Sequence, residues 1–479
     1  MSSVPARALW VVSLLSWAFV ALAGPSAAVP GLGPGPLPFD LGGSPSSALV
    51  SAVLAVSVLT GGAALWCALD AVRAGWVPSR RLVTGAVLGA ALLVVLLPPV
   101  GSADHLSYAA YGRVAVLGGD PWTASPATFA GGVDPVVSAV RDPWRDTPSV
   151  YGPVGGLVMA LASLVGGDSV RTTVWAGQLL LAAGWVALAL GLDAALRASP
   201  TLRARVAVAW SLNPLLLTVG LGGAHADVLA GTAALATLLL ARRHPLLAGL
   251  ALGMAVGTKL PYGAVGGGLL VAWLLTRREL GTGWLVRGVL GALVVLVPAH
   301  VWAGVHAYDQ ARTASRYVSL ATVWRPLVEA GLPRGLLLPG LALIMIGLLA
   351  LWWRPLTGDR TLDGHRWEAL AAGTAAALAL GYLLGASYVL PWYDLLLWGP
   401  LTLAVAIPAL DRLLTLRLTV LALAYVPGLV DGMSPTVQAV TLGFRREVAP
   451  WAAWLWLVLA LGLGLPRRRG QPLPTRARP

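Results

Sequence analysis

The chain has 479 residues, of which 57% are hydrophobic and only 11% are charged. A water-soluble protein carries about 25% charged residues, so the soluble, disordered and fibrous classes are excluded. Apolar blocks such as 82–99, 174–192 and 369–387 approach the length that crosses about 30 Å of hydrocarbon. We therefore predict an all-α, polytopic integral membrane protein.

The apolar blocks between charge clusters predict about fourteen transmembrane helices, within a range of 11–14. They are expected near 8–23, 47–69, 82–99, 172–196, 206–221, 227–241, 245–258, 262–276, 284–302, 335–353, 369–389, 395–410, 418–431 and 449–465. The first block also has features of a signal peptide, and we expect it to remain as an uncleaved helix. Residues 1–466 are predicted to form one transmembrane domain, followed by a disordered basic tail over 467–479.

The positions of the charges predict which side of the membrane each loop occupies. With the N-terminus in the cytoplasm, 22 of the 33 basic residues fall in cytoplasmic segments, including the pair Arg412 and Arg417. This is the asymmetry described by the positive-inside rule. It explains the net charge of +13 without a nucleic-acid partner, and it places the tail beside anionic lipid.

Two segments on the predicted outer side exceed an ordinary connection, 100–171 and 303–334. The cytoplasmic loops are too short to hold a nucleotide-binding domain, so we expect the chemistry on the outer face. Residues 153–166 are apolar but short, which favours an interfacial or re-entrant helix. The single cysteine, Cys67, permits neither an intramolecular disulfide nor a cysteine metal site.

The strongest catalytic candidate opens the first outer segment. Asp104, Tyr108 and Tyr111 recur at i, i+4 and i+7, which places them on one face of a helix. A carboxylate at a partly apolar membrane boundary is expected to have a raised pKa, which suits a general base. The alternative is that Asp104 only caps the following helix.

Basic residues on the outer side are candidates to bind a leaving phosphate. Lys259 is the only lysine of the chain and lies between two short apolar halves, where a charged group is costly unless it is paired or near water. The alternative is a lysine that extends to the interface. Arg312 and Arg316 are spaced i, i+4 and predict either a phosphate-facing pair or a solvated face. Arg113 belongs to the same set of outer cations.

Polar and aromatic residues at predicted outer turns are candidates to bind sugar. His225 and Asp227 would orient an acceptor or assist Asp104, and the alternative is a purely structural polar turn. Trp392 begins an inward helix, where aromatic residues also occur as ordinary interface residues. The Gly- and Pro-rich stretch that holds Asp120 and Tyr151 predicts a compact loop, with a lid that performs no chemistry as the alternative.

These residues together carry a resemblance to a known family. The matching motifs, in chain order, are Asp104 with Ser107 and Tyr108, then Gly112, Gly119-Asp120-Pro121, 148–153, Asn213-Pro214, 222–227, Thr258-Lys259 and Pro391-Trp392-Tyr393. The chain resembles the polyprenol-phosphate-mannose-dependent α-1,6-mannosyltransferases of actinobacterial lipoglycan assembly, which are GT-C glycosyltransferases. It differs at Ala226, where relatives often carry Asn, a position that the resemblance associates with donor or acceptor preference.

The resemblance implies a GT-C-like fold and an inverting, metal-independent transfer of mannose from polyprenyl-phosphate mannose to a lipoglycan or mannan acceptor. It implies a multi-pass protein of the plasma membrane with an extracytoplasmic site. Asp104 would be the base, and Tyr108, Tyr151, Trp392 and Tyr393 would contact substrate together with the charged candidates above. Another polyprenyl-phosphate sugar, arabinose or glucose, stays open, as do a lipid-linked glycan transporter or flippase and a non-catalytic scaffold.

Overall fold

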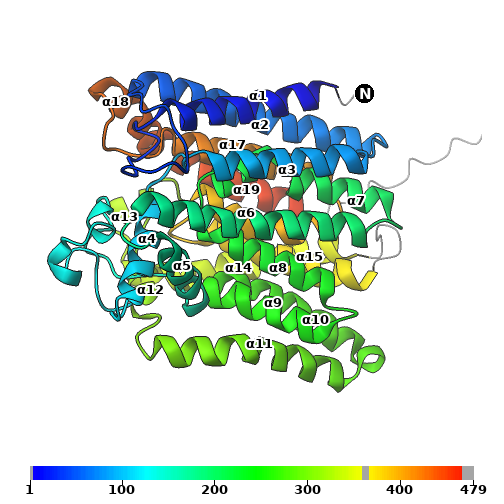
Figure 1. Ribbon diagram of the computed structural model, residues 1–479. Coiled ribbons are helices and arrows are strands. Elements are labelled where there is room, and N and C mark those ends of the chain that lie inside the picture. The colour runs from blue at the N-terminus through cyan, green and yellow to red at the C-terminus, as the bar shows by residue number, and fades with distance from the viewer. Residues whose placement is uncertain (1–3, 359–365, 466–479) are drawn as a thin grey trace, which may run out of the picture.

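A computed structural model describes residues 4–358 and 366–465 of the chain. Helices run side by side along one common direction (Figure 1). Over the described residues there is no strand, and the isolated bridge between Ser26 and Val29 is the one β-type pairing found there. The prediction of an all-α protein is confirmed. The predicted basic tail over 467–479 lies outside the described residues.

Seven stretches within 4–358 and 366–465 are long and apolar enough to cross a membrane. They are Val4–Ala23 (α1), Ser47–Arg73 (α2), Val170–Ala195 (α6), Thr282–Ala303 (α11), Arg334–Thr357 (containing α14, Leu337–Thr357), Trp367–Gly385 (within α15, Arg366–Gly385) and Pro435–Gly464 (α18, Pro435–Gly443, then α19, Ala449–Gly464). Helices at the other predicted crossings are shorter, so the total of about fourteen transmembrane helices stays a prediction.

The other α-helices are α3 (Arg80–Leu96), α4 (Asp104–Val116), α5 (Pro153–Gly166), α7 (Pro200–Val206), α8 (Ala226–Leu240), α9 (Pro245–Thr258), α10 (Gly263–Leu280), α12 (Asp309–Ala314), α13 (Trp324–Glu329), α16 (Leu395–Leu403) and α17 (Pro408–Ala424). Short 3₁₀ or π segments are η1 (Phe129–Gly132), η2 (Val137–Ala139), η3 (Ala207–Ser211), η4 (Leu216–Leu221), η5 (Leu260–Tyr262), η6 (Arg334–Leu336), η7 (Pro391–Asp394) and η8 (Phe444–Val448).

The centre of the bundle is formed by an alanine-rich helix. In the apolar segment of α15, within Trp367–Gly385, 78% of the residues are buried. In the corresponding apolar segments of α11 and α14 only 17% of the residues are buried. The alanine side chains of α15 end at Cβ, and helices α14 and α10 can therefore pack closely against α15. The exposed leucines and valines of α11 and α14 would face lipid in a membrane.

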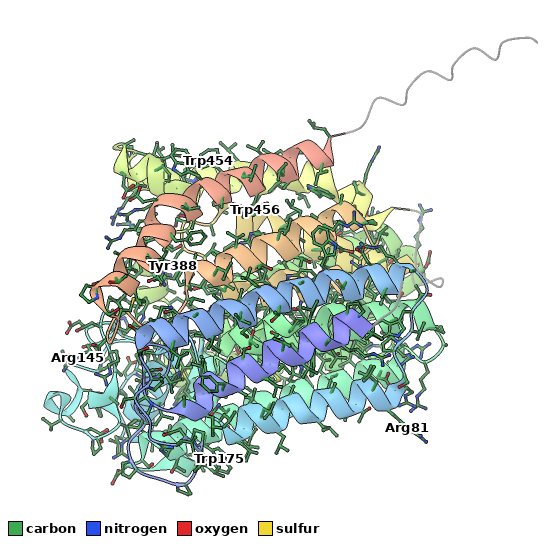
Figure 2. All side chains as sticks on the ribbon, turned by 90° about the horizontal axis from the view of Figure 1, so that it is seen from above. Arg81, Arg145, Trp175, Tyr388, Trp454 and Trp456 are labelled. Atoms are coloured by element: carbon green, nitrogen blue, oxygen red, sulfur yellow. The ribbon has the colours of Figure 1, made fainter. Side chains whose placement is uncertain are left out.

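The two ends of the bundle differ in composition. At one end lie α4, α5, α12, α13 and α18 (Figure 1). Arg145 and Tyr388 lie at this end, whereas Arg81 lies at the opposite one (Figure 2). At the Arg81 end, the carboxylate of Asp193 on α6 accepts hydrogen bonds from Arg80 (2.5 Å) and Arg203 (2.8 Å), which joins α3, α6 and α7. The predicted cytoplasmic loops that carry Arg80 and Arg203 therefore meet at this end.

The crossing predicted over 206–221 is not one continuous α-helix. It is interrupted at Asn213-Pro214, with π-helical turns on both sides. Pro214 has no backbone N–H to continue the helix. The Asn213 side chain compensates, because its Oδ1 accepts from the N–H of Leu215 at 3.1 Å and its Nδ2 donates to the carbonyl of Ala209 at 3.1 Å. This break sets the path into the turn at 222–225.

The placement of Arg417 at a cytoplasmic edge was wrong. The crossing expected over 418–431 is instead α17, Pro408–Ala424, and Arg417 lies inside it with only 4% of its surface exposed. Its guanidinium forms an ion pair with Asp394, and Nη2 donates to the carbonyl of Leu383 at 3.3 Å. Counting charges along the chain assigns every arginine to a loop. Such a count cannot recognise that an arginine inside a helix is paired with a carboxylate on another element.

Candidate active site

A cavity of about 290 Å³ lies at the end of the bundle that carries Tyr388. Its wall comes from α4, the loop before α5, the start of α8, η5, α12, α14, the end of α15 and η7. Nine of the ten tyrosines of the chain line it: Tyr108, Tyr111, Tyr151, Tyr262, Tyr308, Tyr317, Tyr382, Tyr388 and Tyr393. Phenol rings and their hydroxyl groups suit a ligand with both C–H faces and hydroxyls, such as a sugar.

Asp104 lies in this cavity at the first residue of α4, and Tyr108 and Tyr111 line it from the same helical face. The predicted i, i+4, i+7 face is therefore present. The N-cap is Ala103, without a side-chain cap, and the N–H of Asp104 donates to Ser102 Oγ at 2.9 Å. The capping alternative does not describe Asp104, because its carboxylate instead faces His225, with Oδ2 3.3 Å from Nδ1.

The expected raised pKa of Asp104 is the wrong direction. Burial raises the pKa of this carboxyl, but its close contact with His225 and the nearby Lys259 outweigh burial and hold the pKa below its ordinary value. Asp104 is therefore ionised and able to accept a proton. The sequence could not reveal this, because His225 and Lys259 are distant from Asp104 along the chain.

His225 lies behind Asp104 and is held between two neighbours. Its ring stacks on Trp392, with centroids 3.5 Å apart and planes at 12°. On another side Gly223 approaches so closely that a Cβ there would lie 2.7 Å from the His225 ring. One face of Trp392 is thus covered by His225, which leaves the expected sugar stacking to its remaining surface and to the tyrosines.

Lys259 and Asp227 form an ion pair in the cavity wall. Lys259 Nζ donates to Asp227 Oδ1 at 2.9 Å and to Oδ2 at 2.7 Å, and it lies 3.7 Å from the centroid of the Tyr393 ring. The side chains of Lys259 and Asp227 are 14% and 2% exposed. Lys259 is therefore fixed by a carboxylate and an aromatic face, and does not simply extend to the interface.

The loop before α5 is attached to the cavity through Tyr151. Its hydroxyl donates to that of Tyr108 at 3.1 Å, and the two rings meet edge to face. Trp122 Nε1 donates to the Tyr151 carbonyl at 2.8 Å, and the N–H of Gly152 donates to the Thr258 carbonyl at 3.0 Å. The last bond places Tyr151 beside the residue that precedes Lys259.

Five predicted substrate-binding residues do not line the cavity: His225, which lies behind Asp104, and four that lie farther from it. Arg113 pairs with Asp134 (2.9 Å) and with Asp168, and Asp120 accepts from the N–H of Trp122 at 2.8 Å to close a turn. Arg312 and Arg316 are exposed, and the side of α12 that faces the cavity carries Ala311 and Ala314 instead. The structure brings together Asp104, Tyr108, Tyr151, Asp227, Lys259, Trp392 and Tyr393, with His225 behind them.

Sequence reasoning missed the tyrosines beyond 300, which are Tyr308, Tyr317, Tyr382 and Tyr388. No local motif marks them. A usable signal was their scarcity, since ten tyrosines in 479 residues all lie at or near predicted outer ends of helices. No sequence motif marks the apolar edge of the cavity either, where Leu260 is 50% and Leu338 is 58% exposed.

Over residues 4–358 and 366–465, no group of three or more His, Cys, Asp or Glu side chains is arranged to hold a metal ion. The independence from metals that the sequence resemblance implies stays a prediction, because a substrate can itself contribute ligands to an ion.

The model of the α-(1→6)-mannopyranosyltransferase family, described as its N-terminal domain, matches residues 11–277. The chain belongs to this family. The matched region contains Asp104, His225, Asp227 and Lys259, whereas Trp392 and Tyr393 lie beyond it. The assignment confirms the resemblance seen in the sequence, and the family name agrees with the predicted enzyme class, a glycosyltransferase.

Curated relatives carry the same description over part of their length. A probable α-(1→6)-mannopyranosyltransferase of Mycolicibacterium smegmatis is 31% identical over 143 residues, which cover 28% of this chain and 24% of the relative. α-(1→6)-Mannopyranosyltransferase A of Corynebacterium glutamicum is 25% identical over 342 residues, which cover 63% of this chain and 66% of the relative. The chain thus spans about a quarter of the first relative and just under two thirds of the second.

Among solved structures, ArnT from Cupriavidus metallidurans, bound to undecaprenyl phosphate, aligns with a TM-score of 0.42 and 18% sequence identity. The alignment covers 81% of this chain and 77% of that chain.

Proposed function

We propose that the chain transfers a mannosyl residue from polyprenyl-phosphate mannose to a lipoglycan or mannan acceptor, with formation of an α-1,6 linkage and inversion at the anomeric carbon. The reaction takes place at the extracytoplasmic face of the plasma membrane. The family assignment supports the sugar and the linkage, because the matching family and relatives are named for this transfer.

The observation that carries the proposal is the composition of the cavity. One wall holds the carboxylate of Asp104, which contacts His225 at 3.3 Å, and another wall holds Lys259, which is paired with Asp227. Tyrosines fill the space between them, and the edge opens beside Leu260 and Leu338. A base, a cation, a sugar-compatible wall and an apolar entrance are the parts that transfer from a lipid-phosphate sugar requires.

In the proposed mechanism Asp104 accepts the proton of an acceptor hydroxyl as the hydroxyl oxygen attacks the anomeric carbon. The bond between that carbon and the phosphate oxygen breaks, and the electron pair leaves with the polyprenyl phosphate. One base is sufficient for a direct displacement with inversion, so no second carboxylate is needed as a nucleophile. His225 orients the carboxylate of Asp104 through the 3.3 Å contact.

Lys259 would contribute positive charge near the departing phosphate. Two of its N–H groups are directed to Asp227, which keeps the ammonium group in position, and the third is available to a ligand or to the Tyr393 ring. The phenol hydroxyl groups of the cavity add neutral donors to phosphate oxygens. Leu260 and Leu338 lie where a prenyl chain could extend into the surrounding lipid.

The proposal is tested by sugar transfer with purified full-length protein in lipid vesicles. Labelled polyprenyl-phosphate mannose is the donor and short α-1,6-mannan oligomers are the acceptors, with and without EDTA. We expect elongation by wild type in both conditions and none by Asp104→Asn. The matched variant Asp120→Asn, outside the cavity, should elongate normally.

Polyprenyl-phosphate arabinose and polyprenyl-phosphate glucose serve as alternative donors in the same assay. Transfer from either one but not from the mannose donor would replace the proposed sugar. Loss of activity in EDTA would overturn metal independence. Movement of the labelled lipid between leaflets without transfer would favour the transporter.

A further inference from the structure

The ion pair between Asp394 and Arg417 lies outside the cavity and is deeply buried in the helical bundle. The two side chains are 0% and 5% exposed, and Arg417 lies within the apolar helix α17. Removing two charges from water costs several kcal/mol per ion, and their attraction often only offsets that cost. Net stability alone is therefore a weak reason for this pair to be present.

Asp394 is the last residue of η7, and this turn contacts both halves of the candidate active site. Trp392 stacks on His225, which in turn contacts Asp104. The ring of Tyr393 lies 3.7 Å from Lys259 Nζ, and Lys259 binds Asp227. A displacement of this one turn would therefore reach the proposed base and the cation at the same time.

Arg417 holds the turn against a neighbouring helix. Nη1 donates to Asp394 Oδ1, and Nη2 donates to the carbonyl of Leu383 near the end of α15 at 3.3 Å. The planar guanidinium thus joins η7 to α15, which also carries the cavity residue Tyr382. A lysine ammonium group lacks the planar pair of N–H donors and would bind the Asp394 carboxylate and the Leu383 carbonyl less well.

We propose that Arg417, acting through Asp394, is a positioning residue that fixes the turn at 391–394 and thereby sets the geometry of Asp104 and Lys259. The expected effect on sugar transfer rests on the proposed function. The expected effect on the position of the turn at 391–394 does not depend on which sugar is transferred. Arg417 does not touch the cavity, so its effect on turnover is indirect.

A second buried pair provides a matched control. Arg205 and Asp411 are 6% and 1% exposed and form two hydrogen bonds, at 2.8 and 3.0 Å, at the Arg81 end of the bundle. Arg73 also lies 3.7 Å from Asp411, and it keeps Asp70 as a partner when Asp411 is replaced. This pair contacts no cavity residue that the structure describes. Replacing an entire buried pair by apolar residues is often tolerated, whereas removal of one partner leaves an unpaired charge. We therefore compare Asp394→Leu/Arg417→Met with Asp411→Leu/Arg205→Met.

The two double variants and wild type are tested as full chains in lipid vesicles, by steady-state transfer and by hydrogen exchange. We expect Asp394→Leu/Arg417→Met to lower kcat by about 10- to 100-fold, the range that a displacement of about 1 Å can cause. Amide exchange should rise selectively over 388–396. The control pair should change neither. Arg417→Lys should fall between wild type and the double variant, and it replaces that variant if the latter does not fold.

Unchanged kcat and unchanged exchange over 388–396 in Asp394→Leu/Arg417→Met would overturn the inference. Equal losses in both double variants would also overturn it, because they would show a general effect of removing buried charge. If wild type transferred no sugar, the proposed function would fail by itself, and the exchange comparison would still decide whether Arg417 fixes the turn.

Discussion

The ion pair between Lys259 and Asp227 allows stability and substrate use to be separated. In Lys259→Met, the carboxylate of Asp227 loses its two hydrogen bonds from Nζ while it is only 2% exposed. Removal of one partner of a buried pair costs about 3–5 kcal/mol, because the remaining charge is left unpaired. We expect this loss in the free energy of unfolding. In Lys259→Met/Asp227→Leu, where no charge remains, we expect most of it to be recovered.

Donor use should follow a different pattern. Both variants lack the cation proposed to face the phosphate, so the KM for polyprenyl-phosphate mannose should rise in both, whereas the KM for the mannan acceptor should change little. Unfolding is measured by titration with denaturing detergent in mixed micelles, and the KM values are measured in vesicles. Equal stability of Lys259→Met and wild type would refute the argument about the buried pair. Recovery of donor KM in the double variant would refute the role of Lys259 in donor binding.

Other perturbations test the carboxylate and its support. Asp104→Asn should reduce transfer by about 10²- to 10⁴-fold without loss of membrane insertion, since a positioned general base contributes that factor, and near-normal turnover would remove Asp104 from the role of base. Because the folded-state pKa of Asp104 lies below its ordinary value of 3.8, the charged form persists at higher pH and is lost only as pH falls through the lowered pKa. Rate profiles should therefore show no decline from protonation of Asp104 between pH 8 and about pH 5, and a decline in this range that moves to higher pH in Asp104→Glu would contradict this. Gly223→Ala would place a Cβ 2.7 Å from the His225 ring, so we expect slower transfer, whereas Gly443→Ala, where a Cβ meets nothing within 4 Å, should behave as wild type.

The sequence was most informative where its signal is periodic. Apolar block length predicted the helical bundle, and the i, i+4, i+7 spacing placed Asp104, Tyr108 and Tyr111 on the wall that they share. Such patterns depend only on the geometry of one helix, which local sequence contains. The motifs around Asp227 and Lys259 were also found, although their direct pairing is a contact between separate helices and has no local signature.

What the sequence could not supply were interactions between distant segments. It placed Arg417 at a membrane edge, because the partner Asp394 lies on a different element. It gave the pKa of Asp104 the wrong direction, because burial was visible from position alone and the compensating charges were not. It also included Arg312, whose hydrogen bond to Asp309 at 3.3 Å lies on the exposed side of α12.

The concentration of nine of the ten tyrosines in one cavity has a spectroscopic consequence. Biosynthetic incorporation of fluorotyrosine would introduce a fluorine label almost entirely into the candidate active site, without any engineered position. Tyr425, the tenth, packs edge to face against Trp392 and would report on the rear of the same site. Fluorine resonances that shift on addition of donor or acceptor would thus map occupancy of the cavity directly in the unmodified fold, even in a chain whose turnover had been abolished.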